Sequence, residues 1–442
     1  MGERVEQTPR SPESAESPPQ KQEESAEGSK PTRMCSMWEE RLRKGLLALF
    51  FISLSLTVAL QQTLLGLLLT FGVYLSWRDR SLPATPLDRP LLAFLAALLL
   101  STFLSPAILT SLAGYRKLWL VGAFFVTYHL VRGPQEAWRI VSLMVIVAAG
   151  VAAYGIVQHF TGTDLVRRLV GKPVSLTPFW FGQEGGFRVK GLLPSGITYA
   201  HSLSFSLTFL TVRLFASDLR WRERLLWLVG WALVVFALLF SLTRGVWLAY
   251  VVVIVLLGVI KGGKTLLAVG ACAVLLGLSL VLAGSGVRQR VTQIFDLETN
   301  IGRNQIWQAN LDMVKERPLF GWGYGNYRKF RDPYYERYPG ADTTAHAHNN
   351  FLQMWVDAGL VGLAAFLLLC WMILKAGWQA YQLLPAVAEP QRSLALGGVL
   401  SILSFLLGGL TQYNFGDAEV VIVFWAITGV VMRVREWAGQ GQ

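Results

Sequence analysis

The sequence predicts an all-α polytopic membrane protein with about 12 transmembrane helices and a large outer loop between helices 9 and 10. Hydrophobic residues occupy 53% of the 442 positions, and only 15% of the residues are charged. A soluble domain carries about 25% charged residues, so this chain has too few charges to be one. Its 3 cysteines are too few for a disulfide framework or a zinc site. These observations exclude soluble enzymes, secreted disulfide scaffolds and coiled coils.

Residues 1–43 are predicted to form a disordered cytoplasmic tail. The first 33 positions are rich in Ser, Pro, Glu and Gln and contain almost nothing apolar. Such a segment cannot bury enough surface to offset the entropy lost on ordering. It is also too long and too acidic for the start of a signal peptide, so the first apolar segment is expected to remain as a membrane anchor.

Twelve apolar segments follow, each close to the roughly 20 residues that cross a bilayer as a helix. Together they define a transmembrane domain over 44–435, and 436–442 form a short cytoplasmic C-terminus. The segments are 44–60, 62–77, 90–105, 110–131, 138–158, 196–216, 225–242, 244–260, 265–284, 350–374, 393–412 and 417–434.

The positions of the basic residues predict the topology, because Lys and Arg concentrate in cytoplasmic connections. With a cytoplasmic tail, every inner connection contains Lys or Arg, whereas the short outer connections near 61, 106 and 413 contain none. Both termini are therefore predicted to be cytoplasmic. The net charge of +12 also raises the possibility of nucleic-acid binding. That function is not expected, because the basic residues separate apolar segments instead of clustering on one face. The basic residues of the predicted cytoplasmic connections are Arg78, Arg80, Arg89, Arg132, Arg139, Arg213, Arg220, Arg222, Arg224, Lys261, Lys264, Lys375, Arg392, Arg433 and Arg435.

Two long polar connections, 159–195 and 285–349, lie on the predicted outer face and are expected to form the functional region. Within the second, apolar residues at helical spacing predict a helix from Arg303 to Lys315, which Pro318 ends. The glycine-rich stretch 321–325 is interpreted as a tight turn. A nucleotide-binding loop is not expected there, because no βαβ pattern accompanies it.

Arg244 lies at the junction between two apolar helices, at the outer boundary of the membrane. An arginine in such a turn is costly unless it pairs with another group, so it is a candidate for function. The alternative is an arginine whose side chain reaches the lipid headgroups. The very short turn leaves little freedom for that, and we favour a functional role.

Arg188 and Lys190 place positive charge just before the sixth predicted helix. The free N–H groups at a helix N-terminus also favour anions. Two arginines at helix ends on one face, Arg188 and Arg244, indicate a phosphate or pyrophosphate site, because a guanidinium binds two oxygens at once. A solvated loop arginine at 188 is the alternative.

His348 lies where the second long loop meets the tenth helix. Histidine suits general-base catalysis, because it titrates near neutral pH. His346 and His348 also form an H-x-H pair, but only Asp342 is nearby as a third ligand, so metal binding is not expected. A loop histidine without a function is the remaining alternative.

Four stretches resemble the superfamily of O-antigen ligases and polymerases, which build bacterial surface polysaccharides. They are GGFRVKGLLPSGITYAHSL at 185–203, SLTRGVWLA at 241–249, ERPLFGWGYGNY at 316–327 and AHNNFLQMWVDAGLVGL at 347–363. The resemblance extends over roughly 45–435 and includes the twelve-helix topology and the large loop before the tenth helix. Thr243 replaces a serine of the family pattern and keeps its hydroxyl group.

The resemblance implies glycosyl transfer without a metal or cofactor at the periplasmic face of the bacterial inner membrane. The donor would be a glycan on undecaprenyl pyrophosphate, and the acceptor a sugar hydroxyl of the lipid A core. Arg188 and Arg244 would bind the pyrophosphate, with Lys190 and Asn349 as further substrate-binding residues, and His348 would act as the base. Membrane lipids are the only other partners expected.

Three alternatives remain open. An O-antigen or exopolysaccharide polymerase would use the end of another lipid-linked glycan as acceptor, and a protein O-oligosaccharyltransferase would use Ser or Thr of a protein. Both belong to the same family, and the sequence does not separate them from a ligase. A secondary transporter is the third alternative, but the chain shows no similarity between its halves, and its unusual charges lie in outer loops.

Overall fold

The computed structural model describes residues 1–3, 37–81, 84–171, 176–181, 184–263, 270, 301–341 and 346–440. The chain divides into two units, residues 1–35 and 36–442, and the elements below all belong to the second. They are helices apart from one two-stranded antiparallel sheet.

The bounds of the elements are as follows. The first half contains α1 (Met37–Ser53), α2 (Val58–Asp79), α3 (Asp88–Phe103), α4 (Ile108–Gly114), the 3₁₀ helix η1 (Tyr115–Val121), α5 (Gly122–Leu130), α6 (Pro134–Thr161), α7 (Leu165–Leu169), β1 (Thr177–Phe181), β2 (Glu184–Arg188) and α8 (Gly196–Leu214). The second half contains α9 (Trp221–Phe240), α10 (Arg244–Lys261), α13 (Ile301–Glu316), α14 (Tyr327–Phe330), α15 (Asp332–Tyr335), α16 (Asn350–Leu383), α17 (Gln391–Gly408), the 3₁₀ helix η3 (Asn414–Gly416) and α18 (Ala418–Gln440).

The prediction of a helical multi-pass membrane protein is confirmed. Among the described residues, 6 helices are long and apolar enough to cross a membrane, namely α2, α6, α9, α10, α16 and α17. Eleven of the predicted apolar segments overlap helices. The segment at 265–284 lies outside the described residues, so the total of about twelve spans stays a prediction.

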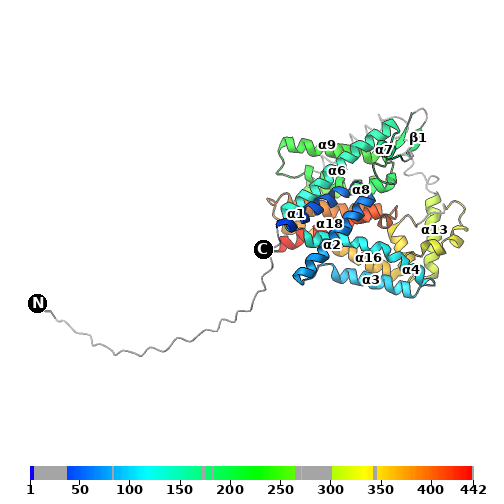
Figure 1. Cartoon of the computed structure of the whole chain (residues 1–442), viewed down its shortest axis with the longest axis horizontal. Coiled ribbons are helices and arrows are strands. Elements are labelled where there is room, and N and C mark those ends of the chain that lie inside the picture. Colours follow the sequence, from blue (N-terminus) through cyan, green and yellow to red (C-terminus); the bar gives the residue numbers. More distant parts are fainter. Residues whose placement is uncertain are drawn as a thin grey trace, which may run out of the picture. The chain divides into compact units, whose positions relative to one another are not determined.

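The most buried helices, α8, α17 and α18, form the centre of the helical bundle. Helix α8 packs on α17, α18 packs on α5, and α6 packs on α9. Helix α3 lies along α16 (Figure 1). Helix α8 is buried over nearly its whole length although it contains many serines and threonines. The hydroxyls of Thr208 and Thr211 donate to carbonyls four residues earlier, so these polar groups are satisfied within the helix.

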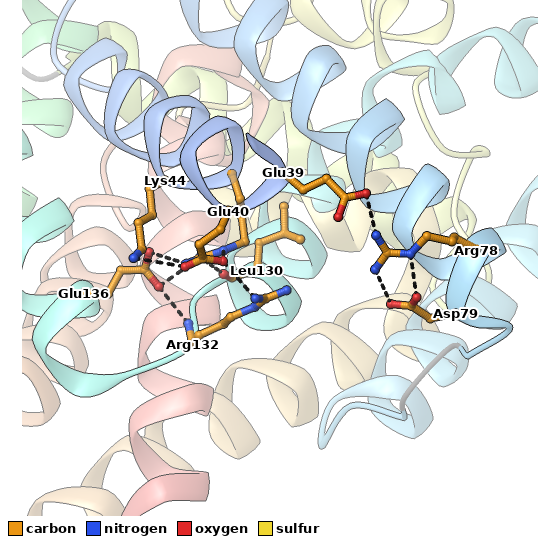
Figure 2. Close-up of polar contacts among 9 residues, drawn as sticks. Glu39, Glu40, Lys44, Arg78, Asp79, Leu130, Arg132 and Glu136 are labelled. Carbon is orange, nitrogen blue, oxygen red and sulfur yellow. Dashed lines mark hydrogen bonds and ion pairs between the residues drawn. The ribbon is translucent and has the colours of Figure 1, made fainter. Parts of the chain in front are cut away.

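Helix α1 begins at Met37 and therefore includes residues that the sequence had assigned to the tail. Arg43 is only 1% exposed and lies 2.7 Å from Glu40 and 2.9 Å from Glu136. Arg78 lies 2.5 Å from Glu39 and 2.7 Å from Asp79. Figure 2 shows its guanidinium between the two carboxylates. Hydropathy misses the start of this helix because Glu39 and Arg43 are charged but buried, and they pair with residues of other helices.

Two predicted segments are interrupted. The segment 110–131 is a continuous span in the prediction, but the structure divides it into α4, η1 and α5. The segment 350–374 extends to Leu383 as α16 and is broken at Gly359, which has φ 66° and ψ −170°. Such a break leaves helical N–H and C=O groups without their usual partners.

Residues 318–322 fill the break in α16. The N–H of Leu360 donates to the carbonyl of Pro318 at 2.8 Å, and Trp322 N–H donates to Val356 at 2.9 Å. A Cβ at Gly359 would overlap the carbonyl oxygen of Leu319, so only glycine allows this approach. Buried backbone groups need internal partners, and residues 318–322 supply them here.

The predicted helix at 303–315 is confirmed as α13, and Pro318 follows its end. With α14 and α15 it forms a small aromatic core that packs on α16 (Figure 1). The hydroxyls of Tyr327 and Tyr335 are 2.6 Å apart, and Asn310 donates to Tyr327 at 3.0 Å. Residues 301–341 of the predicted outer loop therefore form a folded unit.

Candidate active site

Arg188 ends strand β2, and its guanidinium lies against the turn between α9 and α10. Its Nε donates to the carbonyl of Ser241 at 2.8 Å, and its Nη2 approaches the Thr243 hydroxyl at 3.5 Å. The N–H of Val189 donates to the carbonyl of Phe240 at 3.2 Å. These bonds attach the hairpin to the turn that leads into Arg244.

Arg244 is the first residue of α10 and is partly buried. The turn before it is tight, and Leu242 has a φ of 54° in the left-handed region. A Cβ at Gly245 would overlap the Thr411 hydroxyl, so the start of α10 is in close contact with the turn after α17. Arg244 therefore lies beside two chain reversals, 241–243 and 409–413.

The second of these reversals contacts His348. The Nδ1 of His348 lies 2.8 Å from the side-chain oxygen of Gln412. An amide oxygen can only accept a hydrogen bond, so Nδ1 carries the proton and Nε2 is the basic nitrogen of the neutral ring. Gln412 is 7% exposed, so this contact is largely shielded from water. The arrangement is the one that a general base requires.

The backbone at His348 is strained, with a φ of 50°. Its N–H donates to Nδ1 of His346 at 3.3 Å, and the two rings are 4.4 Å apart. Burial and the proximity of His348 lower the pKa of His346 to about 4. His346 is therefore neutral near pH 7, and it does not repel a proton that His348 accepts.

Asn349 caps the N-terminus of α16. Its oxygen accepts from the N–H groups of Phe351 and Leu352 at 2.8 and 3.0 Å, and its nitrogen donates to the carbonyl of Leu410 at 3.0 Å. The sequence had suggested that Asn349 binds substrate. In the structure its side chain holds the His348 segment against the turn that carries Gln412.

Arg303, near the start of α13, is a candidate that the sequence did not select. It is partly buried, and its pKa is lowered by burial and by the nearby charge of Arg244. Two arginines separated by 59 positions are thus close enough to repel each other. Two like charges close together repel each other, and an anion bound beside them offsets this repulsion. Such a pair is therefore a candidate anion site. The sequence signal was only an arginine in the long outer loop.

Lys190 is 4% exposed and lies 3.8 Å from Asp164, the residue that caps α7. Burial and Arg167 lower the pKa of Lys190, and Asp164 opposes this effect. The backbone N–H of Lys190 donates to Gln158 at 3.3 Å. These contacts link Lys190 to the base of the hairpin, so it supports the position of Arg188.

No group of three or more His, Cys, Asp or Glu suitable for a metal ion occurs in the described part of the chain. Asp342, the third ligand considered with His346 and His348, lies outside the described residues. The predicted segment 285–300 of the outer loop lies outside them as well.

The fold and the site define a multi-pass helical membrane protein with arginines at the end of β2 and near the starts of α10 and α13, and with a histidine just before α16. Residues 228–367 match the family described as O-Antigen ligase, a range that contains Arg244, Arg303 and His348. The chain is 26% identical over 263 residues to the O-antigen ligase of Salmonella typhimurium, covering 56% of this chain and 62% of that protein. Over part of its length the chain is therefore similar to O-antigen ligases.

Two further relatives match shorter regions. The chain is 29% identical over 150 residues to the exopolysaccharide production protein ExoQ of Rhizobium meliloti, covering 32% of each protein. It is 37% identical over 75 residues to an uncharacterized protein of Haemophilus influenzae, covering 16% of this chain and 19% of that one. The chain thus spans less than two thirds of the length of each of these three relatives.

Proposed function

We propose that the protein moves a glycan from undecaprenyl pyrophosphate to a sugar hydroxyl of the lipid A core, without a metal ion. The reaction would take place at the periplasmic face of the bacterial inner membrane, with both termini in the cytoplasm. The observation that carries this proposal is the close contact between the start of α10 and the turn 409–413, which brings Arg188 and Arg244 to the turn that His348 contacts.

In this reaction the pyrophosphate is the leaving group. Arg188, Arg244 and Arg303 provide positive charge where negative charge develops as the bond between the sugar and the pyrophosphate breaks. Fixed charges at such a point commonly contribute the largest part of the catalysis. The N-terminus of α10, which begins at Arg244, adds N–H groups that favour an anion. A site of this kind needs no divalent cation to balance the leaving group.

His348 is the base in this proposal. The acceptor oxygen forms a bond to the anomeric carbon, its proton passes to Nε2 of His348, and undecaprenyl pyrophosphate departs. A single in-line displacement of this kind inverts the anomeric carbon. Gln412 acts as a positioning residue, because its bond to Nδ1 keeps Nε2 in the basic form. The energy of the transfer is contained in the donor.

A polymerase is the second candidate function. The similarity to the exopolysaccharide production protein ExoQ favours it, because that relative's name assigns it to the production of a polysaccharide. In a polymerase the acceptor would be the end of another lipid-linked glycan, and the roles of the arginines and of His348 would be unchanged. The two functions therefore differ in the acceptor, and they can be separated by supplying or omitting it.

The test uses the purified protein with a glycan on undecaprenyl pyrophosphate, with and without lipid A core, and separates the glycolipids on a gel. A ligase shifts the lipid A core band only when both substrates are present and without ATP. A polymerase lengthens the donor without the core. No product in any lane from folded protein would contradict the proposal and favour a transporter.

Three variants test the roles of the residues. Arg244→Ala, Arg303→Ala and His348→Ala should each abolish or strongly reduce transfer while the protein remains monodisperse. The matched control is Arg139→Ala, which removes an exposed arginine on a predicted cytoplasmic connection and should leave transfer unchanged. Full turnover in a purified site variant would remove that residue from the mechanism.

A further inference from the structure

A groove of about 630 Å³ lies on the part of the molecule formed by the last turns of α16 and α18 and the residues just before α3. Its apolar lining includes Leu87, Leu368, Trp371, Met372 and Met432. Leu368 is 49% exposed and Trp371 is 62% exposed. The groove is unrelated to the candidate active site, because none of the residues that form that site line it.

Two basic residues, Lys375 and Arg435, line the same groove, and none of its lining residues is acidic. Neither Lys375 nor Arg435 forms an ion pair with any residue that the structure describes. The Nε of Arg435 donates to the side-chain oxygen of Gln379 at 3.3 Å, which orients the guanidinium. In the cluster of Figure 2, by contrast, Arg78 and Arg132 each have a carboxylate partner. The groove therefore presents positive charge that the protein itself does not neutralise.

The apolar and basic residues are separated along the helices. On α16, Leu368 precedes Lys375 by two turns, or about 10 Å. On α18, Met432 precedes Arg435 by about one turn. Both helices run towards the predicted cytoplasmic side, so the apolar end of the groove faces the bilayer interior and the basic end faces the cytoplasmic surface. Trp371, one turn before Lys375, is the kind of residue that lies at headgroup level.

We propose that this groove binds one anionic phospholipid of the cytoplasmic leaflet. The acyl chains would lie along Leu368, Met372 and Met432, and the phosphate would bind between Lys375 and Arg435. Basic pockets between transmembrane helices on the cytoplasmic side suit such headgroups. The chemistry of the lining supports a lipid over a soluble anion, because most of the groove is apolar. The inference depends on the predicted topology and is independent of the proposed function.

The test is native mass spectrometry of the full-length protein in detergent, titrated with phosphatidylglycerol or phosphatidylcholine. The wild-type protein should retain one phosphatidylglycerol in preference to phosphatidylcholine. The double variant Lys375→Gln/Arg435→Gln should bind phosphatidylglycerol about thirtyfold more weakly, because each charge near the surface contributes about fivefold. The matched control, Arg139→Gln/Arg222→Gln, removes two exposed arginines outside the groove and should bind like the wild type.

A second variant tests the apolar end without changing charge. Leu368→Trp should occupy part of the groove and weaken retention of phosphatidylglycerol, and its exposed position makes the change tolerable for folding. Equal binding of the two lipids by the wild type would overturn the proposal. So would unchanged phosphatidylglycerol binding by both the double variant and Leu368→Trp.

Discussion

Gln412→Glu changes the hydrogen-bond partner of the proposed base, His348, and leaves the size of the side chain at position 412 nearly the same. The side-chain oxygen at 2.8 Å from Nδ1 of His348 is kept, and a negative charge is added. The carboxylate stabilises the protonated imidazole, so His348 holds its proton to higher pH and is less available as a base at a given pH. An opposite charge at this distance moves a titration by about one to three pH units. The acidic limb of the profile of kcat/KM against pH should therefore move upward by that amount.

The assay measures glycan transfer by purified protein between pH 5 and pH 9 in steps, roughly the range where histidines titrate. Gln412→Ala serves as the neutral comparison. It removes a hydrogen bond that contributes about 0.5–1.5 kcal/mol, which corresponds to roughly a two- to twelvefold fall in kcat/KM. Its profile should fall in height without moving to higher pH.

Gln135→Glu is the matched control, because it makes the same substitution at an exposed position on a predicted cytoplasmic connection. It should reproduce the wild-type profile. An active Gln412→Glu variant whose acidic limb of kcat/KM against pH coincides with that of the wild type would contradict this prediction. In that case either His348 is not the base, or Gln412 does not act through it.

Three further changes test the fold around the site. Arg43→Ala should lower the free energy of unfolding by about 1.5–3 kcal/mol, because it removes a guanidinium that is 1% exposed and forms ion pairs with the partly buried carboxylates of Glu40 and Glu136. Denaturation in detergent measures this change, and an unchanged value would show that the ion pairs of Arg43 add nothing to stability. Gly359→Ala should lower the melting temperature, because the new Cβ would overlap the carbonyl of Leu319 and because the φ of 66° at this position is unfavourable for alanine. An unchanged melting temperature would contradict the tight contact at the break in α16. Burial and His348 lower the pKa of His346 to about 4 in the folded protein. The unfolded chain therefore binds a proton to His346 more readily, and the free energy of unfolding should fall as the pH drops from about 6.5 to 4. His346→Asn should reduce this slope, measured as melting temperature against pH, and an identical slope would show that another group causes it.

Much of the helical fold could be predicted from the sequence. Transfer of a 20-residue apolar segment into lipid depends on composition alone, so the overlap of eleven predicted segments with helices follows from local properties. The same is true of α13, whose apolar spacing and following Pro318 define a helix without reference to the rest of the chain. Arg244 and His348 were also found locally, because each is a polar residue at the end of an apolar segment.

Hydropathy could not predict where these helices break. The interruption of α16 at Gly359 is stable only because the chain at Pro318 provides hydrogen-bond partners for the exposed backbone groups. Likewise, charged side chains of α1 are buried beside its start because they pair with side chains of α2 and α6. In both cases the partner lies far away in the sequence.

The sequence by itself therefore determined that the protein is a helical membrane protein, and it placed two of the site residues at helix ends. Only the tertiary structure brought Arg303 to Arg244 and Gln412 to His348. Gln412 and His348 are 64 positions apart, and nothing in the local pattern around either residue specifies the other. The physical reason is that apolar burial fixes which segments enter the membrane, whereas the contacts between polar groups at their ends depend on how the helices pack.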